Sequence, residues 1–470
     1  MVDFKSILTN LPEVKRPEQK NIGFKAKLKW TLLMLVAFFV LSLIPLYGLG
    51  QNSLQQFEQL SIILGASFGS LLSLGIGPLV TASIVLQLLQ GSGMVKFDTT
   101  THDGRAFFQG LQKVLAVFFI IFEGAIYVLM GGLAPEAGLL PSTFRMMEFV
   151  LIAQLLVGGL LVMFMDEVVS KWGFGSGISL FIVAGVADQI IVRAFSPLSS
   201  AGTWALGTGG DPIGQVWVFF KSIATGNLQS AGLAIAAIIA TVLIFVIAVY
   251  VQSMKVEVPL SFGRIRGYGI RWPLKFLYTS NIPVILIAAL LANIQLWARL
   301  LEGWGRPILG TFTGNVPTSG IVAWLFGPDI VGELIRSGSF NWVVFAQAGI
   351  YALFMIGGSV LFSVLWVQTS GMNAENQARQ IISSGLQVPG FRRDPRVIEQ
   401  LLSRYILPLT VMGGAAVGFL AASADLLGAL SRGTGILLAV MIVYQLYEHV
   451  AQEHMMDMHP MLRKMMGGSE

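Results

Sequence analysis

The chain of 470 residues contains no cysteine and few charged residues. The absence of cysteine excludes disulfide bonds, thiolate metal sites and cysteine nucleophiles. Charged residues make up only 12% of the sequence and hydrophobic residues make up 54%, whereas soluble domains carry about 25% and about 45–50%, respectively. The composition therefore indicates a membrane protein.

Residues for catalysis are also scarce. No Gly-x-x-x-x-Gly-Lys-[Ser/Thr] loop occurs, so the chain has no nucleotide-binding P-loop of its own. The four histidines, which are His102, His449, His454 and His459, fall in loops or at the end of the last apolar segment. An intramembrane hydrolase would need a buried base, and none is available. We expect no enzymatic activity, no cofactor and no metal site.

Ten apolar segments are long enough to cross a bilayer, which takes about 20 residues. They are 28–47, 74–92, 107–131, 144–165, 176–192, 230–251, 277–297, 343–367, 404–424 and 433–450. The N-terminus shows no signal-peptide core, so the first segment is expected to remain in the mature chain. An even number of spans places both termini on one side.

Lysine and arginine set the orientation. Of the 30 basic residues, 23 fall on the side that holds the N-terminus and every second loop. This distribution predicts that the N-terminal side is cytoplasmic. Two cytoplasmic loops, 252–275 and 368–403, are long, basic and rich in turn residues. Orientation alone explains part of their charge, but their length also fits docking to a polyanion or an acidic protein partner.

The second span is interrupted. Leu74-Gly75-Ile76-Gly77-Pro78 breaks the helix, because Pro78 lacks an amide hydrogen and the glycines weaken a helix. A broken helix at membrane depth needs a protein or aqueous surrounding, which marks a candidate pathway. The preceding segment, 54–73, is rich in serine and glutamine and suits a re-entrant helix. Span 7 begins with Asn281-Ile282-Pro283, and paired interruptions favour two inverted five-span repeats.

Ionisable groups within the spans are few. Glu123 is the clearest, and Asp166, Asp188 and Asp425 lie near span ends. Intramembrane acids are functional candidates, but we expect Glu123 to make a structural hydrogen bond between helices. Aliphatic pairs at i and i+4 occur instead, at Ile76 and Val80 and again at Ile178 and Ile182. Each pair fits ordinary packing or a constriction that closes by dewetting.

Several stretches resemble the SecY family, the large subunit of the Sec protein-conducting channel, and its archaeal members most of all. They are LPEVKRPEQKNIGFKAKLKWT, LGIGPLVTASIVLQLLQGSG, RAFFQGLQK, DEVVSKWGFGSGISLFIVAGV, KFLYTSNIPVILIAALLANIQLW, PLTVMGGAAVGFLAA and SRGTGILLAVMIVYQLYEH, in order along both halves. The chain departs from the family's Gly-rich turn at Ser431-Arg432-Gly433.

The resemblance implies an all-α polytopic membrane protein with ten transmembrane helices. Two inverted five-helix halves would surround an hourglass pore, with a re-entrant plug helix. The expected divisions are a cytoplasmic segment 1–27, an N-terminal half 28–192 with the plug at 55–73, an external loop 193–229, a C-terminal half 230–450 and a cytoplasmic tail 451–470. The implied function is a passive channel that translocates unfolded secretory polypeptides and releases hydrophobic segments sideways into lipid.

The resemblance also implies roles for individual residues. The pore ring would consist of Ile76, Val80, Ile178, Ile182, Ile285 and Leu438, and the plug would include Phe57, Leu60, Ile62, Ile63, Leu64 and Gly65. Polar positions along the lateral gate are matched by Thr81, Gln112 and Asn293. Docking to the ribosome, including its RNA, would fall to Arg264, Arg266, Arg392 and Arg393.

The implied partners are SecE-like and SecBeta-like small membrane subunits, the ribosome, nascent chains with signal sequences and the lipid bilayer. The expected location is the plasma membrane. A secondary transporter with inverted repeats and a midplane solute site is the alternative from another class, and a scaffold without a pathway is a third. An aliphatic collar with a plug favours the channel, whereas convergent polar or charged groups would favour the transporter.

Overall fold

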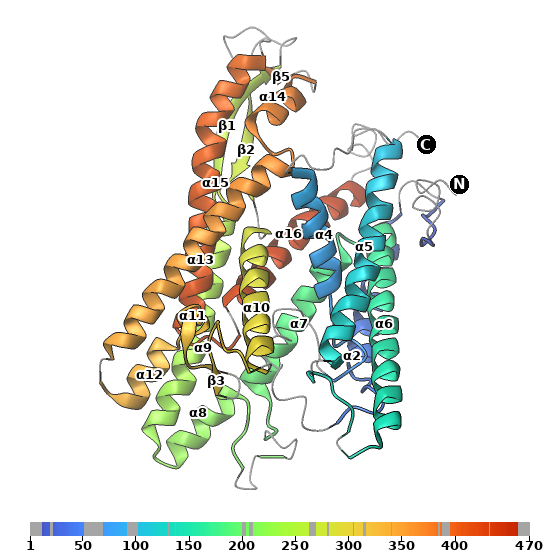
Figure 1. Cartoon of the computed structure of the whole chain (residues 1–470). Helices are drawn as coiled ribbons and strands as arrows, with labels where there is room; N and C mark the ends of the chain where they lie inside the picture. The colour runs from blue at the N-terminus through green and yellow to red at the C-terminus, as the bar shows by residue number, and fades with distance from the viewer. Residues whose placement is uncertain are drawn as a thin grey trace. The chain divides into compact units, whose positions relative to one another are not determined.

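The structure is a computed structural model, and it describes most of the chain. The described residues are 12–18, 22–50, 69–91, 102–129, 131–136, 138–199, 204–205, 210–262, 269–279, 282–303, 305–313, 316–339, 341–383, 386–387, 395–431 and 433–458. These residues are mainly helical (Figure 1). Contacts divide the chain into a first unit of residues 1–86, 95–188 and 442–470, and a second unit of residues 87–94 and 189–441.

Long apolar helices dominate both units. The long helices are α2 (Phe24–Ser42), α4 (Gly77–Gly91), α5 (His102–Leu129), α6 (Pro141–Trp172), α7 (Gly177–Phe195), α9 (Leu228–Ser253), α10 (Ile282–Gly303), α13 (Trp342–Thr369), α15 (Pro395–Leu426) and α16 (Gly433–Met458). Within the described residues, eight of them are long and apolar enough to span a membrane. The other two, α2 and α4, fall at the first two expected spans.

Some of these helices end at other residues than the apolar segments predict, and the local sequence explains the differences. The first span is expected to reach Tyr47, but α2 ends at Ser42, because Pro45 cannot donate to a helix and disfavours a helical residue before it. Conversely, α6 and α15 are longer than expected. Both helices continue into polar sequence, such as Met165–Trp172 of α6, which a search for apolar segments does not include.

In the first unit, α6 packs against α2 and α5, as the neighbouring ribbons in Figure 1 show. Phe38 of α2 stacks on Phe181 of α7, with ring centroids 4.7 Å apart. The Thr31 hydroxyl of α2 accepts a hydrogen bond from the backbone N–H of Phe174. Together these contacts position α7 beside α2 and α6.

The second unit contains the remaining elements. Short elements connect its long helices: α8 (Gln215–Ala224), β1 (Lys255–Phe262), β2 (Gly269–Lys275), β3 (Phe312–Thr313), β4 (Val316–Pro317), α11 (Gly320–Trp324), α12 (Ile330–Ser337), α14 (Ala374–Ser383) and β5 (Leu386–Gln387). The helices α10, α13 and α15 pack on one another, and α8 packs against α9.

The two basic loops form a small β-sheet, which the predicted all-α fold did not include. Strands β2, β1 and β5 pair antiparallel in that order, with Lys255 opposite Lys275 and Ser261 opposite both Gly269 and Gln387. The sheet lies beside α14 and the start of α15 (Figure 1). A shared core joins them, formed by Val258, Leu274, Tyr278, Val367, Ala378, Ile381, Ile398, Leu402, Ile406 and Leu409. The described parts of the two loops are therefore folded against one another.

Candidate functional site: aliphatic residues at helix starts

The break predicted in the second span is present. Residues 71–76 form successive turns, Gly75 has a φ of 53°, and α4 begins only at Gly77. The carbonyl of Ile76 accepts hydrogen bonds from the backbone N–H groups of Leu79 and Val80, each at 3.1 Å. Ile76 and Val80 thus lie one helical turn apart at the start of α4.

The second aliphatic pair lies at the start of α7. Ile178 and Ile182 are the second and sixth residues of this helix, so they share one face. The carboxylate of Asp166 on α6 accepts a hydrogen bond of 2.9 Å from the backbone N–H of Ile178. A Cβ on Gly177 would lie 2.6 Å from the Cα of Asp166, so only glycine allows this approach. The acid predicted near a span end therefore fixes the helix that carries Ile178.

We predict that Asp166→Ala loosens the start of α7. The first N–H groups of a helix need acceptors, and removing such a cap costs about 0.5–2 kcal/mol. Asp166→Asn keeps an oxygen acceptor and serves as the matched control. Thermal unfolding in detergent should show a lower midpoint for Asp166→Ala than for Asp166→Asn; equal midpoints would contradict a capping role.

The second unit contributes the other two candidate ring residues. Ile285 is the fourth residue of α10 and is half-buried, and Leu438 is the sixth residue of α16 and is buried. All six candidates are therefore in the first two turns of a helix or directly before its first residue.

The candidate gate residues lie on two helices of the first unit and one helix of the second. Thr81 on α4 forms a side-chain hydrogen bond with Glu123 on α5, and its hydroxyl lies 2.9 Å from the carbonyl oxygen of Gly77. Gln112 precedes Glu123 on α5 and lines a cavity in the first unit. Asn293 falls within α10. The structure thus pairs Thr81 with Glu123, and the hydrogen bond between helices that we expected for Glu123 is present.

A cavity of about 700 Å³ lies within the first unit. Its lining is apolar where Leu79, Met163 and Ile178 contribute and polar where Gln112 and Lys113 contribute. Glu13, Arg16 and Pro17 border it as well, so residues 12–17 form part of its wall. The cavity therefore reaches one member of the candidate ring.

Other predicted site residues lie outside the described residues. They are the plug residues Phe57, Leu60, Ile62, Ile63, Leu64 and Gly65 and the docking arginines Arg264, Arg266, Arg392 and Arg393. Among the residues that the structure describes, no group of three or more histidine, aspartate or glutamate side chains could hold a metal ion.

Sequence reasoning missed the partners of the acids. Asp425 at the end of α15 accepts hydrogen bonds from the Tyr351 hydroxyl at 2.5 Å and from the Gly433 N–H at 2.7 Å. Glu167 was not singled out, although it lies in an otherwise apolar helix next to Asp166. The position of Glu167 in an apolar helix was enough to mark it as a candidate. The sequence does not show which residues it contacts.

The eight described helices that are long and apolar enough to cross a bilayer define the class, a polytopic membrane protein. The SecY family profile matches residues 70–447, and the profile of the plug domain of Sec61p matches residues 36–69. The chain belongs to the SecY family and is a subunit of a protein-conducting channel with a plug. The plug match covers most of the segment predicted to be re-entrant.

Relatives and solved structures agree over nearly the whole chain. The protein translocase subunit SecY of Methanothermobacter thermautotrophicus is 47% identical, covering 99% of this chain and 98% of the relative. SecY of Pyrococcus horikoshii is 44% identical, covering 97% of each. A structure described as a protein conducting channel superposes with a TM-score of 0.80 at 40% identity, covering 97% of this chain and 99% of the other. Sec61 in the canine ribosome-channel complex gives 0.78 at 39% identity, with the same coverage.

Proposed function

We propose that Ile76, Val80, Ile178, Ile182, Ile285 and Leu438 form the constriction through which an unfolded polypeptide passes. The supporting observation is that all six are aliphatic and lie at the starts of four helices. Aliphatic side chains can close a pore by excluding water, and they offer a passing peptide no hydrogen bond that would retain it. Because each residue lies in or directly before the first turns of a helix, the helical backbone holds its side chain in position.

A lateral gate is the second part of this proposal. Thr81, Gln112 and Asn293 were assigned to it from the family resemblance, and Glu123 joins them because it bonds Thr81 across α4 and α5. Polar contacts between helices in lipid are worth about 0.6 kcal/mol and up to about 2 kcal/mol each. Such a contact holds two gate helices together without preventing their separation by a hydrophobic segment.

The energy for transport comes from partners in this proposal, and the chain itself supplies the surface on which a partner docks. The chain supplies no catalytic step, and SecE-like and SecBeta-like subunits complete the channel. Arg264, Arg266, Arg392 and Arg393 contact the ribosome, for which the likeness to Sec61 in the canine ribosome-channel complex is support. The excess of lysine and arginine on one side supports both termini in the cytoplasm, and the resemblance to archaeal members supports the plasma membrane as the location.

The acids argue against the alternative of an ion-coupled transporter. Such a site needs carboxylates that converge on a pathway. Here Glu123 bonds Thr81, Asp166 caps α7 and Asp425 joins α13, α15 and α16. Three of the four acids named in the sequence analysis therefore have structural partners.

The proposed function is tested in liposomes that contain the chain with both small subunits. Ribosome-bound nascent chains carry either an intact signal sequence or one whose apolar core is replaced by serine and glycine. We expect protease protection of the first chain only. Equal protection of both chains, or protection of neither together with ion-driven solute uptake, would overturn the proposal.

A further inference from the structure

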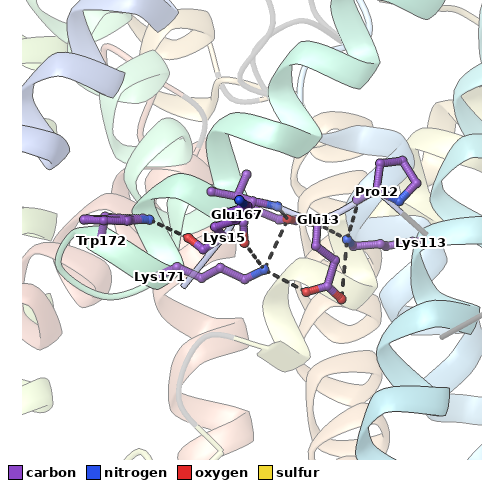
Figure 2. A network of polar contacts seen from close by, with 8 residues as sticks. Pro12, Glu13, Lys15, Lys113, Glu167, Lys171 and Trp172 are labelled. Carbon is purple, nitrogen blue, oxygen red and sulfur yellow. Dashed lines mark hydrogen bonds and ion pairs between the residues drawn. The ribbon is translucent and has the colours of Figure 1, made fainter. Parts of the chain in front are cut away.

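Residues Pro12–Pro17, here called the strap, are bound across α5 and α6 in the first unit. Lys171 of α6 donates to the carbonyl of Val14 at 2.8 Å, and Trp172 donates to the carbonyl of Lys15 at 2.9 Å. Lys113 of α5 donates to the carbonyl of Pro12 at 3.2 Å. The backbone of the strap is therefore fastened by side chains from two helices, as Figure 2 shows.

Glu167 is at the centre of these contacts. Its carboxylate accepts the Val14 N–H at 2.9 Å, pairs with Lys171 at 3.5 Å and forms an ion pair with Lys113. The side chains of Glu167, Lys113 and Lys171 are only 12%, 15% and 16% exposed, whereas Glu13, which pairs with Lys171 at 3.0 Å, is 47% exposed. Loss of one partner from such a sheltered pair costs far more than loss of an exposed one.

The same helix, α5, carries the contact proposed for the gate. Lys113 directly follows Gln112, and Glu123 lies further along α5 where it bonds Thr81. The strap residues Glu13, Arg16 and Pro17 share a cavity wall with Gln112 and Ile178. Thus α5 is attached to α6 and the strap through Lys113, and to α4 through Glu123.

We propose that Glu167 is a positioning residue for channel opening: it fastens α5 and the strap to α6 and so holds the gate helix in its resting place. This inference rests on the proposed function, because it needs α5 to be a gate helix. A contact made only in the resting state shifts the opening equilibrium when it is removed. Glu167→Gln keeps the size of the side chain and removes its charge, so it should favour opening.

The exposed member of the cluster also predicts a pH dependence. The hydrogen bond from Lys171, together with the positive charges of Lys113 and Arg16, lowers the pKa of Glu13 from its ordinary value of 4.5. The contribution of Glu13 to strap attachment is therefore fully present above that value and is lost only as the pH falls through the lowered pKa. A spin label at Lys15→Cys, whose side chain is exposed, should stay immobile from neutral pH down to about pH 5 and gain mobility in stronger acid. Gain of mobility near neutral pH would contradict this.

The test uses the full chain with both small subunits in liposomes and measures two quantities. One is the mobility of the spin label at Lys15→Cys, which keeps the backbone carbonyl that accepts the hydrogen bond from Trp172 of α6. The other is the ratio of protected precursor for a weakened signal sequence to that for the intact one. The variants are Glu167→Gln and, from the α5 side, Lys113→Gln. Glu375→Gln is the control, because it removes an exposed ion pair with Arg379 in the second unit.

We expect Glu167→Gln to mobilise the label and to raise the ratio about threefold to tenfold, equivalent to about 0.7–1.4 kcal/mol. Lys113→Gln should raise the ratio similarly, and Glu375→Gln should change it less than about twofold. A purely structural role would lower both precursors together and leave the ratio unchanged. An unchanged ratio in Glu167→Gln and Lys113→Gln, with or without a mobile label, would overturn the inference. If the parent protein fails to protect the intact precursor, the proposed function itself is wrong.

Discussion

Ile285→Ser and Ile182→Ser are expected to make the resting channel leak ions and accept weaker signal sequences. Burial of an isoleucine side chain is worth about 1.5–3 kcal/mol, so a hydroxymethyl group lowers the cost of wetting the constriction. Since about 1.4 kcal/mol corresponds to a factor of ten, we expect resting conductance to rise about tenfold. Single-channel recording in planar bilayers measures it.

Leu290→Ser is the control for this experiment. Leu290 also lies on α10 and is 39% exposed, but it is not a candidate ring residue. We expect its conductance to match that of the parent protein. Parental conductance and parental signal stringency in both isoleucine variants would rule out a ring at these positions.

Gly158→Val is expected to prevent correct folding of the first unit. A Cβ on Gly158 of α6 would lie 1.9 Å from the carbonyl oxygen of Leu71, which begins the turns that lead to Ile76. Backbone cannot rotate away as a side chain can, so overpacking here should cost at least about 1–3 kcal/mol. The yield of monodisperse protein in size-exclusion chromatography should fall strongly.

Gly349→Ala is the matched control on α13. Nothing lies within 4 Å of a Cβ at Gly349, and the residue is exposed within a helix. Alanine is favoured over glycine in helices by about 0.5–1 kcal/mol, so the yield should be unchanged or slightly higher. A normal yield of Gly158→Val would show that α6 and the turn before α4 do not approach closely.

The sequence was sufficient to predict the helical architecture and the break in the second span. Apolar length identified the spans, and Pro78 with its flanking glycines identified the break that appears at residues 71–76. The first span was placed five residues too far, because an apolar count does not register the effect of Pro45. The basic charge of loop 252–275 indicates a docking surface but does not reveal that β1 pairs with β2 within it.

The contacts between helices were beyond prediction from one sequence. Thr81 and Glu123 were each noticed, but nothing in their spacing shows that they meet. Val14 and Glu167 are 153 residues apart, and only the folded chain brings them within 2.9 Å. Periodicity identifies which residues share one helix face, whereas partner helices are chosen by tertiary packing. The sequence pattern identifies the pairs Ile76 and Val80, and Ile178 and Ile182, and the family resemblance completes the candidate ring. The contacts that hold α7 and α5 come from the structure.

Disulfide crosslinking at Ile285 is the most direct test of the proposed constriction. The chain has no native cysteine, so a single cysteine can be placed at Ile285 and matched by one at Val284, its fully buried neighbour, and one at exposed Ser339. A stalled secretory chain with one cysteine supplies the partner. We expect an adduct at Ile285 that requires a functional signal sequence, and none at Val284 or Ser339. No adduct at Ile285, in a preparation shown to engage the stalled chain, would contradict a polypeptide pathway past this residue.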